Sequence, residues 1–366
     1  MPNVVRARLG LLRETFPGER RVALTPGDVR ALSERMSIRF QRGCGAGAGH
    51  TDDAYVAAGA LPAVFEELVS LSKIIVGVRR PEETGTFESN SVLAYLGSGA
   101  GSPANSSRGG PLHLDLARIS GMRDAGRMDV SSRQAAITGH VAVLEATREL
   151  GLAHAMLTVD GNFVRPIAMV AIGTDPAALQ AIATAKRLGA KTHGFGFEQS
   201  AQQKIERLGA RFLGADLAYS STDIFVAQST TELAILRRQL ATCLSNMQLI
   251  VTSVAPTGEP APILLDDEML SALHAGTIIV DLAAENGGNC ASTHAGQTVD
   301  VSNVRIVGST TLASRAASEA SCLFSEGLRN LIEHLLDING HLRFDRLDPL
   351  IRAMIGDQPI ERSIAS

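Results

Sequence analysis

Short apolar runs alternate with helix-like stretches along the first third of the chain. The runs have the length of buried strands and stand at residues 7–12, 38–42, 74–78 and 92–96. Between them, Thr25-Pro26 and Thr51 are start signals for helices, because threonine caps a helix and proline suits its first turn. This alternation predicts an α/β region.

The alternation continues in the second half of the chain, where the strands are apolar on both faces. Expected strands lie at residues 167–172, 192–197, 249–254, 277–281 and 305–308, and expected helices at 176–188, 201–208 and 231–244. Strands that are apolar throughout are typical of a parallel sheet with helices on both sides. We therefore predict a second α/β domain with a parallel sheet.

Two longer helices are expected to join the two halves, at residues 129–150 and 312–336. The expected domains are residues 1–135 plus 320–366, and residues 136–319. The apolar residues of the tail are expected to pack on the first domain: Leu342, Phe344, Leu347, Leu350 and Ile351.

Composition and charge exclude several classes of protein. The 366 residues are 45% hydrophobic and 20% charged, with a net charge of −4, and the basic residues are dispersed, which argues against a nucleic-acid partner. No apolar run can span a bilayer, so we expect no direct membrane insertion. The four cysteines form no CxxC pair and the nine histidines show no metal spacing, so we expect no metal site and a reducing, cytoplasmic location. Residues 97–111, rich in glycine, serine and proline, are expected to form a mobile loop.

Three stretches carry a resemblance to a known family. Residues 13–26 read RETFPGERRVALTP, residues 179–190 read LQAIATAKRLGA, and residues 275–290 read AGTIIVDLAAENGGNC. They resemble the alanine dehydrogenase and NAD(P) transhydrogenase α-subunit family, and most closely the NAD(H)-binding component of proton-translocating transhydrogenase. The resemblance covers nearly the whole chain in the family's order and weakens between Gly97 and Arg127.

The resemblance implies an α/β fold of two Rossmann-like domains with parallel sheets, joined by two long helices. It implies a cleft between the domains, a homodimer, and NAD or NADP as the cofactor. In the transhydrogenase branch the nicotinamide passes hydride to NADP on another component, so the resemblance also implies a membrane-bound partner subunit.

The nucleotide-binding turn departs from the expected G-x-G-x-x-G pattern. Its residues are Gly173-Thr174-Asp175-Pro176-Ala177-Ala178, in which Gly173 and Ala178 fill the first and third positions and Asp175 replaces the second glycine. An aspartate before a proline is a good helix N-cap, so its carboxylate is expected to accept the N–H groups that normally bind phosphate. It also brings negative charge beside a diphosphate, so cofactor binding is expected to be weakened or lost.

The acid that normally binds the adenosine ribose is also missing. Its position is occupied by Gly196, and Glu198 lies two residues further on. Glu198 is either a substitute for that acid or a solvated side chain, and Lys204 and Arg207 are expected to be surface charges. By resemblance, six further residues are candidates for lining the cofactor site: Val254, Ala255, Leu282, Ala283, Asn286 and Asn289. Tyr219 is a candidate for a shortened lid.

The expected reaction centre is altered as well. Alanine dehydrogenases need a lysine and a histidine, at positions occupied here by Gly77 and Gly97, which argues against amino-acid dehydrogenation. Arg21, which binds the substrate carboxylate in that branch, is present. The transhydrogenase loop is matched by Arg118, Asp129 and Ser132, which are the other catalytic candidates, although Gly126 replaces its glutamine. Asp129 is equally explained as an acid at a helix start.

These observations leave three functional hypotheses. The chain is a transhydrogenase-type oxidoreductase with weakened or altered cofactor binding, or a non-catalytic paralogue that serves as a dimeric scaffold or partner subunit. A third hypothesis is a changed chemistry on a different substrate, in a cleft rebuilt around Arg21 and the loop at residues 97–127.

Overall fold

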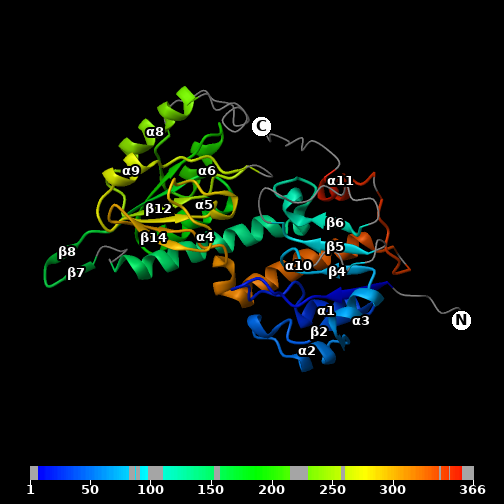
Figure 1. Cartoon of the computed structure of the whole chain (residues 1–366). Coiled ribbons are helices and arrows are strands. Elements are labelled where there is room, and N and C mark those ends of the chain that lie inside the picture. Colours follow the sequence, from blue (N-terminus) through cyan, green and yellow to red (C-terminus); the bar gives the residue numbers. More distant parts are fainter. Residues whose placement is uncertain are drawn as a thin grey trace, which may run out of the picture. The chain divides into compact units, whose positions relative to one another are not determined.

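The structure of the protein is a computed structural model. The described residues are 7–81, 87, 91–97, 110–151, 157–214, 230–256, 260–337, 339–345 and 347–356. The chain divides into unit 1, Met1–Gln134 with Ala313–Ser366, and unit 2, Ala135–Leu312. Each unit contains one large sheet covered by helices (Figure 1), so the predicted α/β fold class is confirmed. The loop predicted at 97–111 and the lid candidate Tyr219 lie mostly or wholly outside the described residues.

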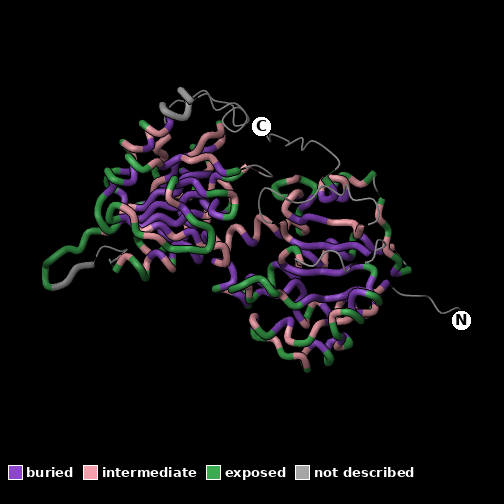
Figure 2. Tube along the Cα trace, in the orientation of Figure 1, coloured by how far each residue is buried: buried purple, intermediate pink, exposed green. Residues whose placement is uncertain are grey.

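Unit 1 is built on a six-stranded parallel sheet of order β3-β2-β1-β4-β5-β6. Its strands are β1 (Arg8–Leu11), β2 (Ser37–Gln41), β3 (Leu61–Ala63), β4 (Ile74–Val76), β5 (Val92–Tyr95) and β6 (Leu112–Asp115). Its helices are α1 (Pro26–Ser33), α2 (Asp52–Ala57), α3 (Phe65–Leu71), α10 (Ala317–Leu335) and α11 (Pro349–Ile355), and α4 (Val130–Leu150) starts there. Figure 2 shows the strands of this sheet as the buried layer of the unit.

The tail packs on unit 1 as predicted, with one exception. Leu350 and Ile351 of α11 belong to the main core, and Leu342 and Phe344 pack against it. The prediction was wrong for Leu347, which is 82% exposed. It stands in the turn just before Asp348, the N-cap of α11, where the chain reverses and turns this side chain to solvent.

Unit 2 is built on a seven-stranded sheet of order β11-β10-β9-β12-β13-β15-β14. Its strands are β9 (Ala168–Ile172), β10 (Lys191–Phe195), β11 (Arg211–Phe212), β12 (Leu249–Thr252), β13 (Ile278–Asp281), β14 (Thr298–Val301) and β15 (Val304–Val307). Its helices are the later part of α4, α5 (Pro176–Arg187), α6 (Ala201–Arg207), α8 (Thr230–Leu244) and α9 (Asp267–Ala272).

The sheet of unit 2 is mixed rather than wholly parallel, because β14 pairs antiparallel with β15. Only Ser302 and Asn303 separate the two strands, and both have positive φ, as a two-residue hairpin turn requires. A second hairpin joins β7 (Leu157–Val159) and β8 (Asn162–Val164) through Asp160-Gly161, again with positive φ at both residues. Both hairpins were missing from the sequence-based prediction.

Each large sheet has its switch point where its first and fourth strands along the chain lie side by side. These pairs are β1 with β4 in unit 1 and β9 with β12 in unit 2. In open α/β sheets, ligands bind at the carboxyl ends of the strands at such a point. Among the described residues, no helix combines the length and apolarity needed to cross a membrane.

Helix α4 packs closely on the first turn of α5 within unit 2. A Cβ atom at Gly139 of α4 would lie 2.0 Å from the carbonyl oxygen of Ala177. Nearby, His140 Nδ1 and Thr184 Oγ1 are hydrogen-bonded at 3.0 Å. A glycine is therefore required for α4 to approach the start of α5.

We predict that Gly139→Ala destabilises the protein by about 1–3 kcal/mol, because the backbone of α5 must move to admit the methyl group. Without that contact, alanine would instead stabilise the helix by about 1 kcal/mol. Urea unfolding measures the difference, with Arg148→Ala on the exposed side of α4 as the control. An unchanged or increased stability of Gly139→Ala would contradict the proposed close packing.

Candidate functional site

The switch point of unit 2 is bridged by the carboxylate of Asp175. Its Oδ2 accepts the amide N–H of Ala177 at 3.3 Å, and its Oδ1 accepts that of Ala178 at 3.2 Å. The predicted N-cap of α5 is therefore confirmed. The hydroxyl of Ser253, directly after β12, also donates to Oδ1. The side chain thus connects the carboxyl ends of β9 and β12.

This arrangement fills the place that normally receives an anion. Two of the free N–H groups at the start of α5 already have an acceptor, so a phosphate would have to displace Asp175. Burial raises the pKa of Asp175, although the hydrogen bonds from Ser253, Ala178 and Ala177 oppose that rise. Gly173 has φ +127, and a Cβ there would lie 2.6 Å from the Ser253 hydroxyl oxygen.

Glu198, three residues after the end of β10, contacts the turn that contains Thr174. Its Oε1 accepts Thr174 Oγ1 at 2.6 Å and Lys204 Nζ at 2.7 Å. Gly196, at the position of the usual acid, has no room for a side chain, because a Cβ would lie 2.6 Å from Ala201 Cβ and from Thr174 Cγ2. The absence of an acid at position 196 therefore has a steric cause.

The six candidates for lining the cofactor site lie in the segments that follow the carboxyl ends of β12 and β13. Asn289 is fully buried; its Oδ1 accepts the Val254 N–H, and its Nδ2 donates to the carbonyls of Val254 and Pro262. Ala283 is buried, Leu282 is half-buried and Ala255 is exposed. In the described part of the chain, Asn286 Oδ1 is buried without a hydrogen-bond partner. The Asn289 side chain thus joins two strand ends, whereas the side-chain oxygen of Asn286 has no hydrogen-bond partner among the described residues.

Asp281 at the end of β13 holds this motif together. Its buried carboxylate accepts backbone N–H groups and two threonine hydroxyls; the donors are Ala283, Asn289, Cys290, Thr252 and Thr293. One buried carboxylate therefore joins the end of β12 to the segment that follows β13.

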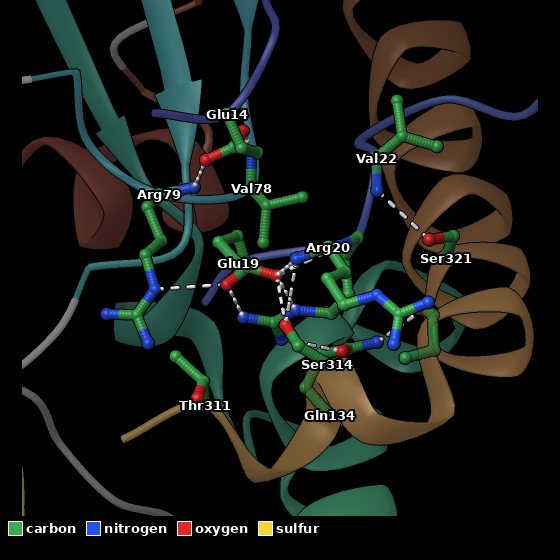
Figure 3. A network of polar contacts seen from close by, with 12 residues as sticks. Glu14, Glu19, Arg20, Val22, Val78, Arg79, Gln134, Thr311, Ser314 and Ser321 are labelled. Carbon is green, nitrogen blue, oxygen red and sulfur yellow. Dashed lines mark hydrogen bonds and ion pairs between the residues drawn. The ribbon is translucent and has the colours of Figure 1, made fainter. Parts of the chain in front are cut away.

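In unit 1, an internal carboxylate binds Arg21. Arg21 Nε and Nη2 donate to Glu19 at 2.8 and 2.6 Å, and Arg21 Nη1 donates to Gln134 at 2.8 Å. Arg79 Nε also donates to Glu19, at 3.0 Å (Figure 3). Burial raises the pKa of Glu19, but the hydrogen bonds and charge of Arg21, with the Ser314 hydroxyl, outweigh it and lower the pKa to about 2. Glu19 therefore takes the position on the Arg21 guanidinium that a substrate carboxylate was expected to take.

Carboxylates also stand beside both glycines of the expected reaction centre. Glu14 accepts the N–H groups of Val78 and Arg79 at 2.6 and 3.2 Å, and its Oε1 would lie 3.2 Å from a Cβ at Gly77. A Cβ at Gly97 would lie 2.3 Å from a carboxylate oxygen of Asp115. Burial raises the pKa of Glu14 to about 7, against the two amide hydrogen bonds, and the charge of Glu19 contributes.

The transhydrogenase-loop candidates are only partly brought together. Asp129 accepts the N–H of Ser132 at 2.9 Å and its hydroxyl at 2.6 Å, so both lie at the start of α4. Arg118 instead pairs with Asp115, at 3.7 Å. The described contacts favour a helix-capping role for Asp129.

Sequence reasoning missed Ser253, Glu14 and Glu19. A usable signal existed, because Glu14 and Ser253 each follow the end of a buried strand by at most three residues. Except for the adjacent residues up to Arg21, the groups that they contact come from distant parts of the chain: the Val78 and Arg79 amides for Glu14, Arg79 and Ser314 for Glu19, and Asp175 for Ser253. These pairings could not be predicted from the sequence.

Comparison with known proteins gives a consistent set of similarities. Residues 10–137 match the family "Alanine dehydrogenase/PNT, N-terminal domain", and residues 142–357 match "Alanine dehydrogenase/PNT, C-terminal domain". The chain is 31% identical over 350 residues to the first part of the NAD(P) transhydrogenase α subunit of Rhodospirillum rubrum, and the match covers 90% of each chain. It is 24% identical over 295 residues to alanine dehydrogenase of Mycobacterium tuberculosis, covering 77% of this chain and 73% of that one. The solved transhydrogenase from Sinorhizobium meliloti superposes with a TM-score of 0.82 at 27% identity, covering 94% of this chain and 97% of that one.

We predict that Glu14→Gln alters the pH dependence of stability. The pKa of the Glu14 carboxyl rises from 4.5 to about 7 on folding. The free energy of unfolding of the protein therefore falls as the pH rises through this range, by up to about 3 kcal/mol. Glutamine cannot ionise, so the variant's stability relative to the parent should increase between about pH 5 and pH 8. Urea unfolding across this range measures it, with Glu66→Gln on the exposed start of α3 as the control; parallel curves for Glu14→Gln and the parent would refute the assignment.

Proposed function

Because the chain belongs to the alanine dehydrogenase/PNT family of NAD(H)-linked oxidoreductases, we propose that it is a transhydrogenase α-subunit-like oxidoreductase with weakened cofactor binding. The observation that carries this proposal is the Asp175 carboxylate, which takes the amide N–H groups of Ala177 and Ala178. The nucleotide-binding unit retains its strand order, its switch point and the turn at Gly173. The fold therefore suits a dinucleotide, whereas the diphosphate position does not accept one without displacement of Asp175.

Three features argue against amino-acid dehydrogenation. Carboxylates stand beside Gly77 and Gly97, and Arg21 is paired with Glu19. A substrate carboxylate would have to compete with an ionised internal one that makes two hydrogen bonds to the same guanidinium. We therefore favour the transhydrogenase branch, in which a homodimer works with a further subunit that holds NADP.

A second candidate function is a non-catalytic paralogue that acts as a scaffold or partner subunit. Four chemically important positions differ from the family pattern: Asp175 fills the anion position, and glycines stand at positions 77, 97 and 196. Together they favour the non-catalytic candidate. Binding of the dinucleotide separates the two candidates. The proposed function requires NADH binding by the folded chain, and the scaffold function does not.

We expect Asp175→Gly to bind NADH at least about tenfold more tightly than the parent protein in calorimetric titration. The substitution removes both the charge and the competing acceptor, while glycine remains an acceptable N-cap. Asp175→Asn is the matched control, because it keeps an acceptor for the amides and loses only the charge. If both variants bind NADH more tightly than the parent, charge repulsion is the cause of weak binding. If only Asp175→Gly does, the cause is the occupation of the amide N–H groups by the side chain.

Unchanged affinity in Asp175→Gly would rule out Asp175 as the cause of weak binding. Absence of binding to the parent and to Asp175→Gly, with both shown to be folded by a cooperative melt, would reject the oxidoreductase proposal in favour of the scaffold.

Binding of NAD⁺ should also depend on pH. Burial raises the pKa of Asp175, so its charge is lost at a higher pH than that of an ordinary aspartate. Repulsion with the diphosphate therefore fades as the pH falls, and affinity should rise several-fold as the pH is lowered from neutral. Titrations of the parent and of Asp175→Asn test this; the same pH dependence in both proteins would show that another group is responsible.

A further inference from the structure

The adenosine side of unit 2 has an acid in an unusual position. In a Rossmann unit, the residue that binds the ribose hydroxyls follows the second strand directly. Here that strand is β10, and the position after it cannot carry a side chain, because a Cβ at Gly196 would contact Thr174 and Ala201 at 2.6 Å. Any acceptor for the ribose must therefore come from elsewhere in the chain.

Glu198 is attached directly to the nucleotide-binding turn. Its Oε1 accepts the hydroxyl of Thr174, which belongs to that turn, and the ammonium group of Lys204 on α6. The side chain of Glu198 is 28% exposed and that of Lys204 is 41% exposed, so a ligand can reach both. Glu198 is thus held at the edge of the site without being closed off.

We propose that Glu198 is the ribose acceptor of this chain and that the Glu198–Lys204 pair selects NAD(H) over NADP(H). This inference rests on the proposed function, because it names the nucleotide that the same site takes. A carboxylate can accept hydrogen bonds from ribose hydroxyls, whereas a 2′-phosphate would meet its negative charge.

Lys204 is the positioning residue of the pair. Burial raises the pKa of Glu198, but the hydrogen bonds from Lys204 and Thr174 outweigh it and leave the pKa below the ordinary value, so the carboxylate is ionised at neutral pH. In the pair, the ammonium group is bound to the carboxylate and balances one charge. Removal of Glu198 would free this ammonium for a 2′-phosphate and reverse the selection.

The test is the ratio of the affinities for NADH and NADPH, measured by calorimetry on the full chain and repeated in the Asp175→Gly background. We expect the parent to prefer NADH at least about tenfold, and Glu198→Gln to reduce this ratio at least about tenfold through tighter NADPH binding. Lys204→Met should increase the preference for NADH, because the carboxylate charge is then unbalanced. Glu206→Gln, the same charge change on an exposed position of α6, is the control and should leave the ratio unchanged.

An equal ratio in the parent, Glu198→Gln and Glu206→Gln would overturn this inference and leave the proposed function standing. Absence of binding of either nucleotide in every variant, with folded protein, would overturn both. The ratio of affinities is informative because, if Glu198 had only a structural role, its substitution would weaken the binding of both nucleotides alike.

Discussion

The hydrogen bonds from the start of α5 to the Asp175 carboxylate are the constraint on which the functional interpretation depends. A helix start in a Rossmann unit offers N–H groups that need an acceptor, and a bound diphosphate usually supplies it. In this chain a side chain supplies it, and Ser253 extends the connection across the switch point. The unit is therefore stabilised internally at the place where a helix start commonly gains contacts from a bound anion.

Unit 1 shows the same principle at its own switch point. Glu14 follows β1 and accepts N–H groups of the segment after β4, as Asp175 follows β9 and contacts Ser253 after β12. The carboxyls of Glu14 and Glu19 differ in pKa for a clear reason, because guanidinium groups bind Glu19, whereas in the described part of the chain the hydrogen bonds to Glu14 come from amides. In both units, an internal acid thus accepts backbone N–H groups at the carboxyl ends of the strands beside the switch point.

Much of the fold could be predicted from the sequence, whereas the side-chain contacts of the candidate site could be predicted only in part. The main strands, the long helices and the Asp175 cap follow from local apolar patterns and cap residues, which act over a few positions. The hairpin at Ser302-Asn303 was missed because its positive φ values are not evident from these residue types, and Leu347 was misassigned because composition does not reveal the direction of a turn. The pairing of Arg21 with Gln134, and of Asp175 with Ser253, joins residues more than 70 positions apart and depends on the finished fold.

The contact between Thr174 and position 196 restricts how this site can evolve. An aspartate introduced at Gly196 would collide with Thr174 and Ala201 before it could bind anything, so it would be harmful on its own. Replacement of Thr174 alone would remove the hydrogen bond to Glu198 without creating a new acceptor. Positions 174, 196 and 201 are therefore coupled, and no single substitution at Gly196 or Thr174 would place an acid directly after β10 without a steric clash.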